Sequence, residues 1–143
     1  MGLISMIWGG PLTKAVNNGD TAEVERLLKN GADPNEAQMG VTVLINACNN
    51  CQVEIVKLLL ANGADPNKKD WEGWRPLMAA AAGAPPGDSR HKEQLCLEIV
   101  QLLIDNGADV NARGKRGQSA LKYAKSAIHE KVQELLIKHG AKE

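Results

Sequence analysis

The sequence contains no phenylalanine, and aromatic residues make up only 3% of its 143 residues. A hydrophobic core in this protein must therefore be aliphatic and rich in alanine. An excess of charge is also absent, because 17 lysine and arginine residues balance 17 aspartate and glutamate residues. Bulk attraction to nucleic acid or to an anionic membrane surface is therefore not expected.

Cysteine pairs and long apolar runs are missing as well. Three cysteines, an odd number, do not make a disulfide framework, so we expect a reducing, cytoplasmic environment. No apolar run approaches the roughly 20 residues of a membrane-spanning helix. The start MGLISMIW has neither a basic segment nor a small-residue cleavage site, and it does not fit a signal peptide.

What the sequence does contain is a segment present in four copies. VERLLKNGADPN, IVKLLLANGADPN, IVQLLIDNGADVN and VQELLIKHGA align on the glycines Gly31, Gly63, Gly107 and Gly140. Each glycine follows an aligned leucine, and these leucines are Leu12, Leu44, Leu77 and Leu121. The interval from leucine to glycine is the same in the first, second and fourth copies. It is longer in the third copy, and the eleven extra positions fall within GAPPGDSRHKEQ, residues 83–94.

Each copy predicts two helices. A short, alanine-rich helix is followed by one with apolar residues at helical spacing, such as Ile55, Val56 and Leu59. The aligned glycine comes just after the second helix, where a left-handed residue commonly ends a helix. One such helix pair cannot bury its apolar face alone, so the copies are expected to stack and shield one another.

The chain resembles the ankyrin repeat family. The third copy carries DWEGWRPLMAAA and GADVN, the second GVTVLINAC and GADPN, and the fourth GKRGQSALKYAK, while the first has PLTKAVNNGD without an upstream hairpin. The resemblance implies an all-α solenoid of stacked helix-turn-helix pairs joined by β-hairpin-like loops, forming a single domain over residues 1–143. Its repeats would span about 9–36, 37–69, 70–113 and 114–143. The sequence departs from the family pattern at Cys51, where glycine is expected.

The resemblance also implies a non-catalytic module that binds a protein partner through hairpin tips and the concave helix face. We expect at least one of Trp71 and Trp74 to contact the partner, because exposed indoles favour association and are enriched in interfaces. Removing both is predicted to abolish binding and to leave thermal stability near normal. The positions aligned with the binding slots of the family are Gln38, Met39, Val41, Asn49, Asn50, Trp71, Glu72, Trp74, Lys115, Arg116 and Gln118.

Basic residues gather on two successive predicted hairpins, and they favour a partner with an acidic patch. The alternative is a solvated edge without a partner. We expect a monomer that binds neither membrane nor nucleic acid. An adaptor and an inhibitor of the immunity type, which blocks an enzyme or toxin, both remain open. The basic residues are Lys68, Lys69, Arg75, Arg113, Lys115 and Arg116.

No catalytic constellation and no cofactor-binding motif is evident, so we do not expect an enzyme. Register alignment places Cys51, Cys96 and His129 along one edge of the stack. Thiolates and an imidazole could bind zinc there, although the spacing lacks the paired C-x-x-C signature. A redox pair of Cys51 and Cys96 is a further alternative. Cys48 is interpreted as a small core residue.

Two segments depart from the repeat pattern, the insertion in the third copy and the apolar residues before the first. GAPPG should end one helix, Asp88 or Ser89 can cap the next, and HKEQLCLEIVQLLIDNG would form a helix about two turns longer than its counterparts. This insertion lies at the edge away from the hairpins, as a tolerated insertion or as a second contact surface. The apolar side chains of residues 3–8 are expected to cover the open face of the first repeat, and contact with a partner is the alternative.

Overall fold

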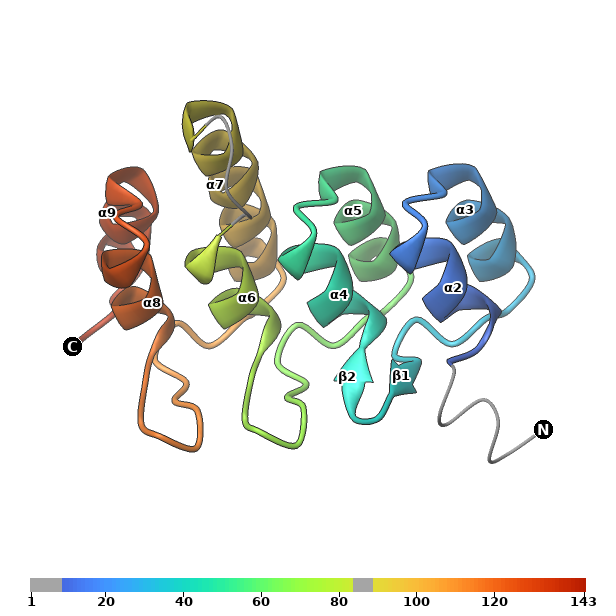
Figure 1. The fold of residues 1–143 in the computed structure, drawn as a ribbon, viewed down its shortest axis with the longest axis horizontal. Coiled ribbons are helices and arrows are strands. Elements are labelled where there is room, and N and C mark those ends of the chain that lie inside the picture. The colour runs from blue at the N-terminus through green and yellow to red at the C-terminus, as the bar shows by residue number, and fades with distance from the viewer. Residues whose placement is uncertain (1–8, 84–88) are drawn as a thin grey trace.

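The computed structural model describes residues 9–83 and 89–143, and it shows a linear stack of helix pairs, as predicted (Figure 1). The first helices of the pairs form one layer and the second helices form another behind it. The first helices are α2 (Pro11–Asn17), α4 (Val43–Asn49), α6 (Pro76–Ala82) and α8 (Ala120–Ser126). The second helices are α3 (Thr21–Lys29), α5 (Val53–Ala61), α7 (Ser89–Asp105) and α9 (Glu130–Lys138).

The core is one continuous aliphatic cluster along the stack. The four aligned leucines are at most 3% exposed, and they fill the space between the two layers. Ala47, Ala80 and Ala124 are fully buried where neighbouring first helices meet. Their small side chains let these helices approach closely, and the stack therefore needs no large aromatic residue to fill its centre.

Hairpins join the pairs and project from one edge of the stack (Figure 1). In the second-repeat hairpin (residues 36–43), β1 (Ala37–Gln38) pairs antiparallel with β2 (Val41–Thr42). The third-repeat hairpin (residues 69–76) is closed by a hydrogen bond from Asp70 N to Trp74 O, and the fourth-repeat hairpin (residues 113–120) by a bridge between Arg113 and Ser119.

Asparagines tie each repeat to the next. Asn35, Asn67 and Asn111 each donate to one backbone carbonyl and accept from one backbone N–H of the following repeat. Asn67, for example, donates from Nδ2 to Gly107 O at 2.9 Å and accepts from Asp109 N at 2.8 Å. These paired amide contacts fix the spacing of the loops, and with it the spacing of the hairpins.

Helix α2 obtains its cap from a residue far along the chain. Thr42 and Ser119 cap α4 and α8 with their own hydroxyl groups, but Gly10 precedes α2 and has no side chain to do so. Glu36, at the base of the second-repeat hairpin, accepts hydrogen bonds from the Thr13 backbone N–H at 2.7 Å and from the Thr13 hydroxyl. A carboxylate from 23 residues downstream thus satisfies the free end of α2.

The insertion lengthens α7, as predicted. This helix has 17 residues, against nine in each of its counterparts, and its extra turns project from the edge opposite the hairpins (Figure 1). Glu93, on the extension, accepts a hydrogen bond from the backbone N–H of Lys131 at 3.0 Å, in the first turn of α9. The proposed cap Asp88 and the apolar residues 3–8 lie outside the described residues.

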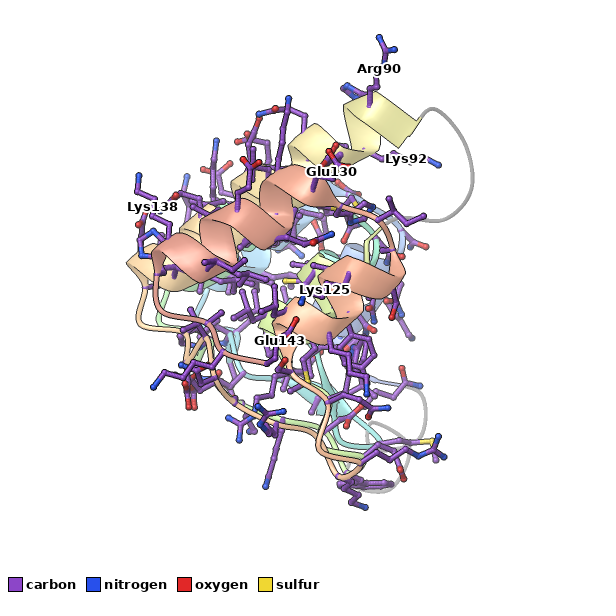
Figure 2. The ribbon with its side chains drawn as sticks, turned by 90° about the vertical axis from the view of Figure 1, so that its left-hand side faces the viewer. Arg90, Lys92, Lys125, Glu130, Lys138 and Glu143 are labelled. Carbon is purple, nitrogen blue, oxygen red and sulfur yellow. The ribbon has the colours of Figure 1, made fainter. Side chains whose placement is uncertain are left out.

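The outer face of the last repeat is polar, as a terminal repeat requires. Figure 2 views this face directly, with Lys125 and Glu143 forming an ion pair across it. Glu130 and Lys138 are exposed on α9, and Ile137 is an exposed apolar exception on the same helix. Among the described helices, none has the length and apolar character to cross a bilayer.

Candidate protein-binding surface

Most of the residues predicted from the sequence to bind a partner lie in the hairpins. Met39 and Gly40 form the second-repeat tip with φ angles of 50° and 84°, a left-handed pair that suits a tight hairpin turn. Gly73 and Gly117 hold the equivalent left-handed positions in the next two hairpins. Because the backbone turns sharply at these glycines, the side chains just before them stand out from the edge of the stack.

A hollow of about 340 Å³ lies between the second- and third-repeat hairpins. We call it the Met39–Trp71 hollow; Ala37, Met39, Gly40, Lys68, Lys69 and Trp71 line it. Met39 is 59% exposed and Trp71 is 65% exposed, although both are large and apolar. A Cβ placed on Gly40 would come within 2.7 Å of the Trp71 indole, so this glycine is what allows the ring to lie against the neighbouring hairpin.

The two lysines give this hollow a positive rim. Lys68 and Lys69 are both exposed, and neither forms an ion pair with any residue that the structure describes. The nearby carboxylate of Asp70 is already engaged, because its Oδ1 accepts from the backbone N–H groups of Glu72 and Trp74. Exposed apolar surface and available cations therefore occur together at this site.

A second hollow of about 340 Å³ lies between the third- and fourth-repeat hairpins. We call it the Trp74–Tyr123 hollow, after the two aromatic residues that line it. Their rings meet edge to face, with centroids 4.8 Å apart and planes at 78°. Above them Glu72 and Lys115 form an ion pair at 4.0 Å. Both rings and one of the two cations that line this hollow thus contact other side chains of the hollow.

Trp71 and Trp74, which were grouped together in the sequence prediction, lie in different environments. Trp71 stands in solvent, whereas Trp74 is half-buried and packs against the core. The expectation that both indoles can be removed at little cost to stability therefore needs correction, because Trp74 joins adjacent repeats. Tyr123, the ring on which Trp74 packs, was not singled out from the sequence, and neither was Gly40. Gly40 and Trp71 are separated by close to one repeat period, which was a usable signal.

Two arginines of the predicted basic patch also hold the loops in place. Arg75 donates to the backbone oxygen of Asn67 at 2.9 Å, and Arg113 donates to that of Gly117 at 2.9 Å. Both guanidinium groups thus take part in the loop structure. Of the other nominated residues, Glu72, Arg116, Asn49 and Asn50 are exposed, while Gln38, Val41 and Gln118 are half-buried. The part that each plays in binding stays a prediction.

The proposed cysteine and histidine edge is only partly assembled. Cys51 and Cys96 meet, with 3.9 Å between their sulfur atoms. His129 does not complete a site with them; its imidazole lies against Gly83, where an added Cβ would overlap the ring. Within residues 9–83 and 89–143, no group of three or more histidine, cysteine, aspartate or glutamate side chains could hold a metal ion. Burial raises the pKa of the Cys48 thiol well above its usual range, which fits a core residue.

The comparison with known families agrees with this architecture. A family model described as ankyrin repeats, in three copies, matches residues 12–113, and α8 and α9 continue the same arrangement beyond the match. No curated protein matches the chain. Ankyrin repeats are generally protein–protein interaction modules and are typically without catalytic activity. The chain, which the family model covers over more than half its length, belongs to the ankyrin repeat family.

Proposed function

We propose that this protein binds a protein partner at the Met39–Trp71 hollow, and that the partner presents an apolar side chain flanked by carboxylates. The observation that carries the proposal is the 65% exposure of the Trp71 indole beside the similarly exposed Met39. An aromatic ring and a thioether provide the contact area, and Lys68 and Lys69 provide the charge that attracts an acidic segment.

The expected contribution of Trp71 is large. A tryptophan buries roughly 150–250 Å² when fully enclosed, so covering its exposed part removes on the order of 100 Å² or more from water. At about 25 cal/mol per Å² this corresponds to roughly 3 kcal/mol, in the range of an interface hot spot. The lysines act mainly on the rate of association, and that effect should weaken as salt rises.

The test is capture of the partner by the tagged full chain from an extract of its own cells, with quantitative mass spectrometry. The variants are Trp71→Ala and Met39→Ala, and the matched control is Ile137→Ala, which removes a side chain of 55% exposure from α9 instead. We expect one protein to be lost with both hairpin variants and retained with the control. A partner that Trp71→Ala retains, or that Ile137→Ala loses equally, would place the interface elsewhere.

The captured partner also separates the two forms of the proposal. If it is an enzyme or toxin whose activity falls on adding the purified chain, the protein is an inhibitor; otherwise it is an adaptor. We expect Asn49 and Asn50, exposed at the end of α4, to extend the contact toward the concave face. The protein is expected to bind as a monomer, which sedimentation equilibrium measures directly.

A further inference from the structure

Two thiols from different repeats meet at the edge opposite the hairpins. Cys51 lies in the turn between α4 and α5, and Cys96 lies within α7, 45 residues further along the chain. Their sulfur atoms are 3.9 Å apart. A disulfide needs about 2 Å between its sulfur atoms, so these two atoms must move about 2 Å closer for a bond to form.

The two thiols differ in access. Cys51 is half-buried and lines a surface hollow of about 360 Å³, together with Gln52, Glu54 and Leu95. Cys96 is fully buried behind it. A small oxidant can therefore reach Cys51 from solvent, and only Cys51 can then present an oxidised sulfur to Cys96.

The surroundings also favour the reactive form of Cys51. The hydrogen bond from Cys96 lowers the pKa of the Cys51 thiol, and the ammonium group of Lys92 on α7 adds to the effect; burial and the nearby Cys48 oppose it without reversing it. Figure 2 shows Lys92 on the projecting end of α7. A thiolate is the form of cysteine that attacks peroxides, so the reactive form is favoured at the more accessible of the two thiols.

We propose that Cys51 and Cys96 are a dithiol that responds to hydrogen peroxide, in which Cys51 is oxidised first and Cys96 resolves it as a disulfide. The Cys51 thiolate attacks one oxygen of the peroxide, the O–O bond breaks, and the departing oxygen takes a proton to leave as water. The Cys96 sulfur then attacks the Cys51 sulfenic acid, the S–S bond forms as the S–O bond breaks, and the Cys96 proton leaves with the second water. The peroxide is reduced as the two thiols are oxidised.

The disulfide would close a ring that contains the third-repeat hairpin. Residues 69–76 lie between positions 51 and 96, so the cross-link would join the second and third repeats on the far side of the stack from Trp71. Such a bond removes chain entropy from the unfolded state and should raise the midpoint of thermal unfolding by at least about 5 °C.

The experiment treats the reduced, full-length protein with equimolar hydrogen peroxide, blocks the remaining thiols by alkylation, and measures the intact mass and a peptide map. We expect one blocked thiol, at Cys48, the loss of two hydrogens elsewhere, and a peptide pair that joins Cys51 to Cys96. The control Cys48→Ala should form the same disulfide. Cys51→Gly puts glycine where the first repeat has Gly19, and glycine readily adopts the left-handed φ angle of this position. This variant should not form the disulfide.

Four outcomes would overturn the proposal. They are thiols that survive the treatment unchanged, a disulfide that includes Cys48, a dimer linked between chains, and Cys51 that accumulates as sulfinic acid while Cys96 stays reduced. Because Cys51→Gly is expected to fold at least as well as the wild type, a loss of the disulfide in that variant cannot be attributed to unfolding. Circular dichroism of the variant before oxidation provides that check.

Discussion

The two hollows along the hairpin edge have the same volume, about 340 Å³, and opposite characters. At the Met39–Trp71 hollow the large apolar side chains stand in solvent beside cations without ion-pair partners among the described residues. At the Trp74–Tyr123 hollow the rings pack together and Lys115 pairs with Glu72, while Arg116 remains exposed. Their equal volumes do not distinguish the hollows, whereas the state of their side chains supports the proposal that one serves recognition and the other the cohesion of the stack.

Removing each indole in turn tests whether the two tryptophans contribute differently to stability. Trp74→Ala should lower the free energy of unfolding by about 2 kcal/mol, because a half-buried ring loses its contacts with Tyr123 and the core. Trp71→Ala should change it by no more than about 0.5 kcal/mol, since a mostly exposed residue contributes little to folding. Urea denaturation of both variants measures the difference. Equal losses would mean that Trp71 is also a structural residue.

A second prediction concerns the glycines of the hairpin tips. Gly40→Ala and Gly117→Ala both place a Cβ at a left-handed residue and should each cost about 1 kcal/mol of stability. Only at Gly40 would the new carbon also strike an indole, since nothing lies within 4 Å of the corresponding position at Gly117. The indole N–H resonance of Trp71 should therefore shift in Gly40→Ala and stay in place in Gly117→Ala. A shift of the same size in both would show that the ring does not rest on Gly40.

A double-mutant cycle on Trp74 and Tyr123 isolates the ring contact itself. Combining Trp74→Leu with Tyr123→Leu should reveal a coupling of about 1 kcal/mol, typical of an edge-to-face pair. The matched cycle on Trp71 and Tyr123 should show none. Coupling in the second cycle would mean that the two hollows are not independent.

The smallest expected effect separates the charges of the two hollows. Lys68→Gln combined with Lys69→Gln should slow partner association several-fold at low salt, while Lys115→Gln should change it less than about twofold, because Lys115 is paired with Glu72. Loss of that exposed pair should alter stability by less than about 0.5 kcal/mol. Stopped-flow measurements at two salt concentrations provide the test. An equal dependence on all three lysines would extend the recognition surface across both hollows.

The sequence predicted the fold well, because repetition exposes the features that make it. The four aligned leucines, the glycines that end the second helices and the longer interval in the third copy were enough to place the helix pairs and the long α7. Contacts between repeats were harder to predict. Nothing in the local sequence distinguishes Trp71 from Trp74, since their exposure depends on Gly40 in one neighbouring repeat and on Tyr123 in the other.

The same limit explains the other differences. The inclusion of His129 with the cysteines followed from register alone, but the direction of its imidazole depends on the space above Gly83. Alignment also did not reveal that Arg75 and Arg113 donate to backbone oxygens several residues away. Alignment gives the position of a residue along the stack, and the direction of its side chain depends on neighbours that alignment does not weigh.

The hydrogen bonds from Thr13 to the distant carboxylate of Glu36 affect the order of folding during synthesis. On the ribosome, Thr13 emerges well before Glu36, so the Thr13 N–H lacks this acceptor until the base of the next hairpin has left the exit tunnel. The first repeat should therefore remain incompletely folded until Glu36 has emerged. An isolated fragment ending before residue 36 should stay largely unstructured. Assembly of the stack would then begin in its interior, with the amino-terminal helix closing late.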